Sequence, residues 1–498
     1  IPLNDPFGGW IKWNRYSPAA LEVVSFGSPS PFSYSAKTIN LQSRRRHESP
    51  QGFLGLATGD VLGVSLAGFS ATAENEEDWE ASASFRLEDF AGHPVIRFSQ
   101  RGAIDEDAWS RMKAARATAS RLSSFGRFTA SFAGFDERRG NGTPLARNWS
   151  DGFDWSLGLE NESFRSYVFR QERSFSSVFP KVDNNRSSEI VVLDQFAVPA
   201  SSLGFVHEHS LNADEHELGL ALTALRREGH TNEDHYFSGS RRNAGGRQTQ
   251  IGISLSDSWS PAENWNLLAD LKGEWFRDDR GDREGWKTSN GSFPARENFD
   301  VGGSLKVSRN LSETINAYFS FRTGVRRPTL NELYRDYRVG DFSVSSNASL
   351  STERATGIEL GLDSRVTDDF SVSLGLFHDQ ITGSVANVSN PAIGQENNAT
   401  RRNLDHARVR GIEISSNWSL SNELSVRLQG LFMDSTVRSC TANPGLVGKR
   451  FAQVPERRAT ASLLWRPSPW ELRLHARHES DRFVFRNSER IILGNFIF

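Results

Sequence analysis

The residues of this sequence best suited to metal chemistry form a histidine-rich stretch near the middle of the chain. The stretch VHEHSLNADEHEL and the residues after it contain His207, His209, His216, His230 and His235. In an extended strand His207 and His209 share one face, with the carboxylate of Glu208 on the other. A metal site needs a ligand set of defined spacing, and none closes here. We therefore predict ordinary histidines in a solvated loop and no bound metal.

A second candidate is the charged run DDRGDREG, Asp278 to Gly285. Its composition is similar to that of a calcium-binding loop, but it lacks the D-x-[DN]-x-[DN]-G frame and the final Glu of that loop. A charged surface loop is the better interpretation. Enzymatic motifs are missing too, since neither a GxSxG elbow nor an HExxH sequence occurs. The sequence therefore predicts neither a cofactor nor a catalytic activity.

The bulk composition excludes further classes of protein. A net charge of −3 and a pI near 6.5 give no electrostatic footprint for nucleic acid. The mean hydropathy is −0.51, and the absence of any apolar run of about 18 residues excludes membrane-spanning helices. The single cysteine, Cys440, excludes an internal disulfide framework. The 13 Trp and 34 Phe are unusual in so polar a chain and need an explanation.

The elements that must position any functional side chain are predicted strands. Apolar residues alternate with small or polar ones over much of the chain, and sustained helical periodicity is not found. The clearest examples are Leu218–Leu222, Ile358–Leu362, Val372–Leu376, Ile412–Ile414 and Leu424–Leu428. Two all-β architectures fit the aromatic content: a large soluble β protein with an aromatic core, and a transmembrane antiparallel β-barrel with aromatic girdles.

Two features favour the barrel. The polar face of the strands consists of Ser, Gly, Glu, Arg and Gln with little Lys, which suits a wet, confined lumen. The connections also alternate in length: residues 308–312 and 366–369 are typical of tight turns, whereas 226–248, 277–298 and 383–406 are typical of long polar loops. Outer-membrane barrels alternate tight periplasmic turns with extended outer loops, and a soluble sandwich has no reason to do so.

The opening sequence IPLNDPFGGWIKW contains a dense group of turn formers. These are Asn4, Asp5, Pro6, Gly8 and Gly9, followed by Trp10. Asx side chains and proline favour a turn, and glycine permits backbone geometry that other residues avoid. The motif resembles the NDPFGGW segment in the plug of TonB-dependent outer-membrane receptors of the vitamin B12/siderophore type. Residues 33–41, SYSAKTINL, resemble the YGxxAxxGxINL terminus of the same plug without its glycines.

Further motifs resemble the barrel of the same family and occur in the same order. They are FDERRGNGTPLARN (135–148), QFAVP (195–199), TGVRRPTLNELY (323–334), SSNASLSTERATGIELGL (345–362), VRGIEI (409–414) and LVGKRFAQVPERRA (446–459). The strongest match is TGVRRPTLNELY, against the family's FRxPTLNELY. The resemblance implies structural roles in the lumen or at strand ends for Arg326, Arg327, Pro328, Asn331, Glu332 and Glu353.

The resemblance also implies a domain organisation. Residues 1–46 correspond to the C-terminal part of a plug domain, and residues 47–498 to a transmembrane antiparallel β-barrel of the 22-stranded type, incomplete at its C-terminus. The chain is then a fragment that lacks the first half of the plug and two or three final strands. The alternative is a natural, shortened barrel that ends at Phe498. An incomplete barrel leaves two unpaired strand edges in lipid.

The function that the resemblance implies is transport across the bacterial outer membrane. In the family a scarce ligand binds to outer loops and plug, and TonB pulls on the plug to open a passage. The expected partners are TonB, outer-membrane lipid, and a small-molecule or metal-chelate ligand such as cobalamin or a ferric siderophore. Two alternatives stay open: a passive porin-like or adhesion barrel without coupling to TonB, and a soluble β-rich carbohydrate-active enzyme with paired carboxylates in a cleft.

Two carboxylates have a physical argument of their own. Glu359 and Glu413 each lie between two apolar residues of a predicted strand, so each should face the lumen. An unpaired carboxylate costs less there than on the lipid face. It could accept hydrogen bonds from arginines of the plug, for which Arg44, Arg45 and Arg46 are candidates; these three could equally form the linker after the plug.

Overall fold

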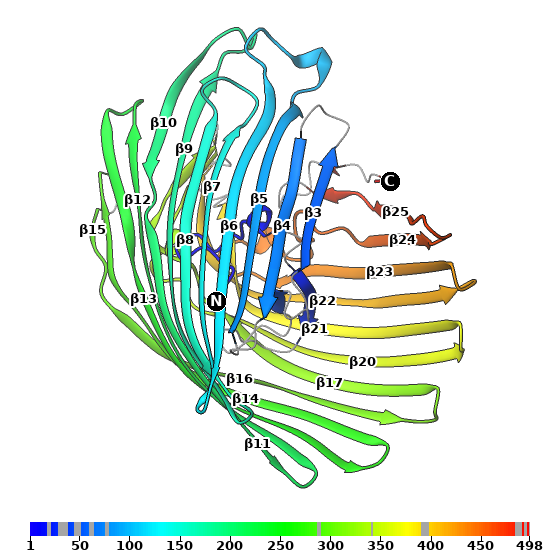
Figure 1. Ribbon diagram of the computed structural model, residues 1–498. Helices are drawn as coiled ribbons and strands as arrows, with labels where there is room; N and C mark the ends of the chain where they lie inside the picture. The colour runs from blue at the N-terminus through cyan, green and yellow to red at the C-terminus, as the bar shows by residue number, and fades with distance from the viewer. Residues whose placement is uncertain are drawn as a thin grey trace.

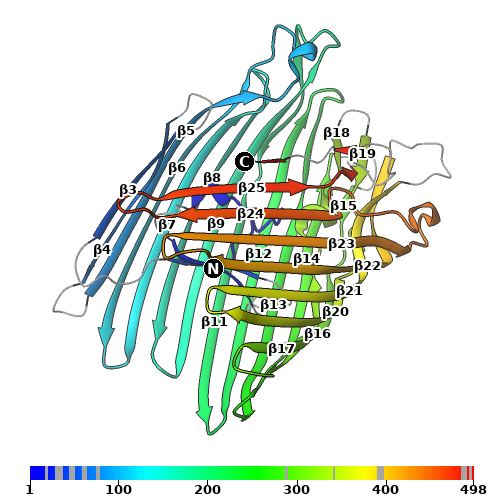
Figure 2. The same ribbon diagram turned by 90° about the vertical axis from the view of Figure 1, so that its right-hand side faces the viewer.

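Most strands of this chain form one large barrel (Figures 1 and 2). The computed structural model describes residues 1–16, 21–27, 38–43, 51–58, 64–74, 79–285, 290–339, 342–389, 398–483, 491–492 and 496–497. Neighbouring barrel strands pair antiparallel, except that β19 and β22 run parallel over a short stretch. The all-β prediction and the antiparallel barrel are therefore confirmed.

The long strands of the barrel are β3 (Gln51–Thr58), β4 (Val64–Glu74), β5 (Trp79–Pro94), β6 (Asp107–Ser123), β7 (Gly126–Gly140), β8 (Arg147–Glu160), β9 (Phe164–Val182), β11 (Ala200–Ala213), β12 (His216–His235), β13 (Ser240–Ala262), β14 (Trp265–Glu284), β16 (Arg296–Asn310), β17 (Ile315–Arg326), β20 (Glu353–Thr367), β21 (Phe370–Ser389), β22 (Asn398–Ser419), β23 (Leu424–Ser439), β24 (Arg457–Trp465) and β25 (Leu472–Glu479). The other members of the same sheet are β10 (Glu189–Ala197), β15 (Gly291–Ser292), β18 (Tyr337–Val339), β19 (Phe342–Ser345) and β28 (Phe496–Ile497).

The remaining elements lie outside this sheet. β1 (Leu21–Gly27) pairs with β2 (Thr38–Ser43), and β26 (Arg482–Phe483) pairs with β27 (Ile491–Ile492). The helical elements are the 3₁₀ turns η1 (Trp13–Arg15), η3 (Phe98–Gln100) and η5 (Pro444–Leu446) and the short helix α1 (Leu330–Tyr334). Among the described residues, no helix is both long and apolar enough to cross a membrane.

The alternation of residue types along each strand decides which side chains face outward. In β13, Gln250 is 7% exposed on the inner face, whereas its neighbours Ile251 and Ile253 are 52% and 49% exposed on the outer face. Leu374 of β21 pairs with Leu362 of β20 on one side and with Ile414 of β22 on the other, and all three apolar side chains are exposed. The barrel therefore has an apolar outer surface around a polar lumen, which is the arrangement of a barrel in lipid.

The two ends of the barrel differ in the length of their connections. Tight turns join β11 to β12 at residues 214–215, β13 to β14 at 263–264, and β20 to β21 at 368–369. Longer segments join β5 to β6, β17 to β20 and β23 to β24 at the opposite end. We call these the short-turn end and the long-loop end. The sequence predicts tight turns at residues 308–312 and 366–369, and both ranges reach the short-turn end. The first contains the start of the connection from β16 to β17, and the second contains the turn from β20 to β21.

The prediction of a long polar loop over residues 226–248 is wrong. β12 continues to His235 and β13 starts at Ser240, so that a turn at 236–239 is the whole connection. Asp234 and Arg241 face each other across these strands with an Oδ1–Nε distance of 2.8 Å. The strands here extend past the apolar band, where both faces carry polar residues, and the alternation that reveals a strand disappears while backbone pairing continues.

The expectation of two unpaired sheet edges is also wrong for the described residues. The sheet is closed, with β28 placed between β25 and β3. β28 pairs with β25 at two positions, Arg477↔Ile497 and His478↔Phe496. An open edge in lipid leaves backbone N–H and C=O groups without partners, so even a short segment that pairs at this seam is stabilising.

Candidate functional site

The motif NDPFGGW forms a compact turn, as its residue types predict. The side chain of Asp5 accepts hydrogen bonds from the backbone N–H groups of Phe7 at 2.9 Å and Gly8 at 2.8 Å. The backbone N–H of Gly9 donates to the carbonyl of Asp5, and Asn4 donates through Nδ2 to the carbonyl of Gly9 at 2.7 Å. Burial of Asp5 raises the pKa of its carboxyl group. The turn holds itself together through its own polar side chains.

Both glycines of this turn are required by its geometry. A Cβ atom at Gly8 would lie 1.7 Å from the indole ring of Trp10. Gly9 has a φ of 77°, and a Cβ there would meet Cγ2 of Thr329 at 2.9 Å. The turn therefore depends on glycine for backbone conformation at one position and for close approach at both.

The turn delivers one aromatic side chain into an apolar pocket in the barrel interior. Phe7 is 1% exposed and belongs to a buried cluster that draws on the barrel wall and on α1. The other members of the cluster are Val198, Ala200, Ala244, Leu330, Leu333, Tyr334 and Leu350. The carbonyl of Phe7 also accepts a hydrogen bond from the backbone N–H of Asn331 at 3.1 Å. The NDPFGGW and PTLNELY motifs, more than 300 residues apart, thus meet in space.

The motif PTLNELY forms α1 because its first residues cap a helix. Thr329 is the N-cap and accepts a hydrogen bond from the backbone N–H of Glu332 at 3.2 Å, while the Glu332 side chain accepts from the backbone N–H of Thr329 at 2.8 Å. This is a complete capping box. The carbonyl of Pro328 accepts a hydrogen bond from Nε2 of Gln248 in the wall at 2.9 Å. α1 is thereby fixed to the barrel.

Two arginines before α1 connect it to the barrel by ion pairs. Arg326 contacts Glu332 at 3.0 Å and Glu353 at 2.6 Å. Burial alone raises the pKa of Glu332, but hydrogen bonds from Arg326 and Thr329 outweigh it and leave that pKa below its usual value. Arg327 pairs with the buried Glu274 and lies over the ring of Phe276 at 3.9 Å.

Sequence reasoning missed the charged contacts between the N-terminal segment and the wall. Lys12 Nζ lies 2.8 Å from Glu137 of β7, and Arg15 lies 3.0 Å from Asp154 of β8. Gln171 of β9 donates to the carbonyl of Pro2 at 2.8 Å. These wall residues are buried on the inner face.

The pattern that pointed to Glu359 also applies to one of these missed residues. Asp154 lies between Phe153 and Trp155, so it is an acidic residue between two apolar neighbours of one strand. Phe153 is exposed on the outer face and Asp154 is buried on the inner face. The alternation could therefore have placed Asp154 in the lumen, although its partner could not be read from the sequence.

Glu359 faces the lumen, where its cationic partner comes from the barrel itself. Arg322 of β17 donates to Glu359 at 3.1 Å and to Asp379 at 2.7 Å, and the hydroxyl of Tyr318 donates to Glu359 at 2.9 Å. Glu413 also lies on the inner face, beside Gly375, and is exposed there. The proposed partners at residues 44–46 lie outside the described residues.

The histidines are on strands, so the prediction of a solvated loop is wrong for them. His207 and His209 share the outer face of β11, and the rings are stacked with centroids 6.5 Å apart. His216 begins β12 and pairs with Asp257 of β13. Within the described part of the chain, no group of three or more His, Cys, Asp or Glu side chains could hold a metal ion.

The run DDRGDREG is also a strand where a loop was predicted. It forms the end of β14, where Asp278 and Asp279 are buried. Asp278 pairs with Arg296 at 2.9 Å, and Asp279 pairs with Arg247 at 2.6 Å. Its charges are thus used in cross-strand ion pairs, and the equal polarity of both faces concealed the strand.

Loops at the long-loop end are connected to one another by hydrogen bonds of charged side chains. Arg186 donates through Nε to both carboxylate oxygens of Asp105, at 2.9 and 2.7 Å, although the two residues belong to different connections. These hydrogen bonds lower the pKa of Asp105 to about 2. Glu189 accepts hydrogen bonds from Thr143 Oγ1 and from the backbone N–H of Leu145, both at 2.7 Å. Three connections therefore form one connected surface.

Comparison with known proteins assigns the family. Residues 78–491 match the family described as TonB dependent receptor-like, beta-barrel. No curated protein sequence matches the chain significantly.

Several solved structures share the fold. The copper transporter OprC superposes with a TM-score of 0.73 at 13% identity, covering 93% of this chain and 73% of OprC. The siderophore receptor PiuA from Acinetobacter baumannii gives 0.73 at 11% identity, covering 100% of this chain and 84% of PiuA. The FrpB iron transporter from Neisseria meningitidis (F5-1 variant, apoprotein form) gives 0.69 at 15% identity, covering 99% and 81%.

Because the family match spans most of the chain and the barrel agrees with it in strand pairing and in its apolar outer face, this chain belongs to the TonB-dependent receptor β-barrel family of outer-membrane transporters, which are not enzymes.

Proposed function

We propose that this protein takes up a scarce metal chelate across the outer membrane with energy supplied through TonB. The observation that carries the proposal is the N-terminal segment, residues 1–16, which is docked inside the barrel on the wall and on α1. Similar folds belong to proteins whose names give copper, siderophores and iron as their cargo. A ferric siderophore or another metal chelate is the ligand class that this similarity supports, with cobalamin as the second choice.

The same proposal includes the domain organisation. Residues 1–46 are the C-terminal part of a plug domain, and residues 47–498 are a barrel of the 22-stranded type. The support is the local structure of the segment, which is held by one buried aromatic residue, Phe7, and by the ion pairs of Lys12 and Arg15. These contacts, and the hydrogen bonds of Phe7 with Asn331 and of Pro2 with Gln171, are all noncovalent, so the segment can be displaced as a unit, as a plug pulled by TonB must be.

The proposed displacement can be tested by tethering the segment to the wall. A Cβ atom built at Gly229 lies 3.0 Å from Cβ of Phe7. This is shorter than the Cβ–Cβ separation of about 3.5–4.5 Å in disulfides, so the bond forms after a small shift of the turn away from the wall. The variant F7C/G229C in the full-length receptor should form a disulfide between plug and barrel. We expect uptake of ⁵⁵Fe-siderophore by iron-starved cells to fall to background when the tether is oxidised and to return on reduction.

The single variants F7C and G229C are the controls, since each has the same substitution without a tether. Uptake should also disappear in cells without TonB. If the oxidised double variant transports as well as its reduced form, and uptake does not require TonB, the barrel is a passive porin-like or adhesion protein. Competition by unlabelled cobalamin or by copper instead of ferric siderophore would reassign the ligand while leaving the coupling intact.

A further inference from the structure

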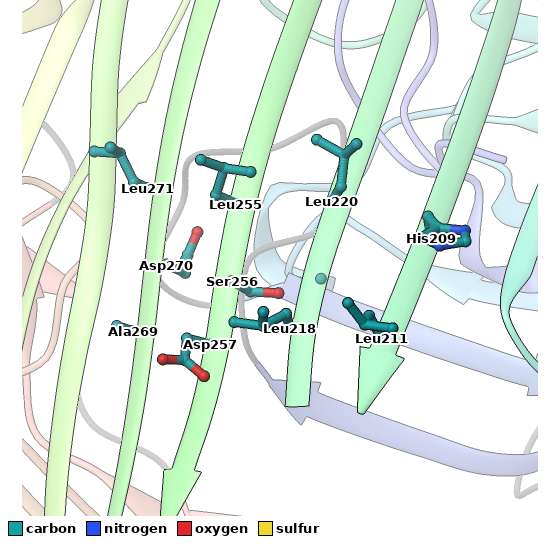
Figure 3. A pocket seen from close by; sticks show the side chains of 11 residues that line it. His209, Leu211, Leu218, Leu220, Leu255, Ser256, Asp257, Ala269, Asp270 and Leu271 are labelled. Carbon is teal, nitrogen blue, oxygen red and sulfur yellow. The ribbon is translucent and has the colours of Figure 1, made fainter. Parts of the chain in front are cut away.

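A groove lies on the outer surface of the barrel near the short-turn end (Figure 3). It has a volume of about 490 Å³ and crosses strands β11 to β14. Its walls are the side chains of Leu211, Leu218, Leu220, Leu255 and Leu271, with His209 of β11 at one side. Asp257 of β13 lies between Leu218 of β12 and Ala269 of β14. The leucines are those of the outward face, so the groove opens toward the membrane.

The hollow arises from one small residue in a row of large ones. Ala269 of β14 stands opposite Asp257 of β13 on one side and Leu305 of β16 on the other. The next outward pair along the same strands is Leu255 opposite Leu271. Where the neighbouring rows fill the surface with leucine, Ala269 leaves a depression bounded by apolar walls and one carboxylate.

Asp257, a carboxylate that lines the groove, lies next to a histidine and a tryptophan outside it. Nδ1 of His216 lies 3.0 Å from Oδ2 of Asp257. The His216 ring stacks on Trp259, with ring centroids 5.3 Å apart and an interplanar angle of 7°. The Asp257 side chain is 32% exposed, so its carboxylate is accessible beside the imidazole. Trp259 and the nearby Trp265 are the aromatic residues that mark a membrane interface.

This placement sets the depth of the carboxylate in the bilayer. A charged side chain on the lipid face costs about 2–4 kcal/mol at the midplane but little near an interface. Asp257 lies one outward position from Trp259 along β13, and we infer headgroup level from that tryptophan. Leu211 and Leu218 share the row of Asp257 across the sheet, and Leu220, Leu255 and Leu271 lie one outward position farther from the short-turn end. The groove therefore combines an apolar surface of leucines with one exposed carboxylate at its edge toward Trp259.

We propose that this groove binds one zwitterionic glycerophospholipid with a primary-ammonium headgroup, an acyl chain lying along the leucines and the ammonium donating to Asp257. The carboxylate of Asp257 determines which lipid headgroup fits the groove. An ammonium group complements the exposed carboxylate of Asp257. An anionic lipid without an ammonium has no partner for Asp257.

The test is native mass spectrometry of the full receptor purified in a mild detergent and titrated with single lipids. Phosphatidylethanolamine, phosphatidylcholine and phosphatidylglycerol with identical acyl chains are the probes, because only the first combines a phosphate with a hydrogen-bonding ammonium. We expect one phosphatidylethanolamine to be retained about ten-fold more than either of the other lipids, as one charge-assisted hydrogen bond provides.

Two variants locate the binding. D257N should remove the preference for phosphatidylethanolamine and leave weak binding of all three lipids. A269F should fill the hollow and lower the retention of every lipid. The matched control is D89N, which neutralises another carboxylate that pairs with a cation, Arg111, at 3.3 Å and that lies far from the groove; it should leave the preference unchanged.

Each result decides for or against the lipid site. Equal retention of the three lipids, or an unchanged preference in D257N, overturns the proposal. Dimers that disappear in A269F show that a second copy of the chain occupies the groove, which overturns it as well. Because A269F retains Asp257 and D257N retains the hollow, a folding defect in one variant leaves the other as the deciding measurement.

Discussion

The docking of the N-terminal segment depends above all on Phe7, and its truncation to alanine gives a quantitative test. Phe7 is 1% exposed and is enclosed by wall residues and by α1. Truncation of a buried Phe to Ala costs about 3–5 kcal/mol, because the apolar contacts are lost and a cavity stays behind. At about 1.4 kcal/mol per factor of ten, the population of the released segment should rise by two to three and a half orders of magnitude.

Trypsin can measure that population, since the segment contains Lys12 and Arg15. In the docked state both side chains are held in ion pairs with buried carboxylates of the wall, Glu137 and Asp154. When opening and closing are fast relative to cleavage, the cleavage rate follows the open population. We therefore expect cleavage after Arg15 to accelerate in F7A by about the factor given above, while the barrel stays resistant.

The control is another aromatic residue of the same segment. Trp13 is 48% exposed, so W13A loses little buried surface and should be cleaved at nearly the rate of the parent chain. The reasoning is refuted if F7A is cleaved no faster than the parent, or if W13A accelerates cleavage as much as F7A. Either result means that Phe7 does not hold the segment in the barrel.

Three further predictions concern the wall and the loops. Leu374→Arg on the outer face should lower the unfolding free energy in lipid by about 2–4 kcal/mol, whereas Ser373→Arg on the inner face should cost far less; equal costs would contradict the orientation of β21. The folded-state pKa of Glu332 is lowered, so its stabilising effect is present above the pKa of an unfolded Glu and is lost as the pH falls through the lowered value; the difference in unfolding free energy between the parent and E332Q should shrink from pH 7 to pH 3. The pKa of Asp105 is lowered to about 2 from 3.8, so the stabilisation by its ion pair with Arg186 is fully present above about pH 4 and is lost as the pH falls through about 2. Protection of the backbone amides of residues 97–106 from hydrogen exchange should decrease over the same pH range. D105N should lack this protection at every pH.

The local chemistry of the two docking motifs could be read directly from the sequence. Asx side chains, proline and glycine at residues 4–9 predict a turn, and the Thr329 and Glu332 spacing is that of a capping box. Both arise from hydrogen bonds between residues at most a few positions apart. The order of residues alone therefore specifies them.

The ends of the strands were harder to predict than their centres. Alternation identified the apolar band, as at Leu374, because lipid on one side and water on the other impose a period of two. It did not identify the parts of β12, β13 and β14 beyond the band, where both faces are polar. There the strands continue because backbone pairing and cross-strand ion pairs such as Asp279 with Arg247 support them.

By itself the sequence determined the class of fold, the inward or outward side of residues such as Glu359, and the turns that two short motifs form, because each depends on neighbours along one strand or loop. The tertiary structure alone decided that Phe7 enters a pocket made partly by α1, that Glu359 pairs with Arg322, and that Ala269 leaves a groove on the outer face. These features depend on strand register and barrel closure, which bring together side chains that the linear order keeps far apart.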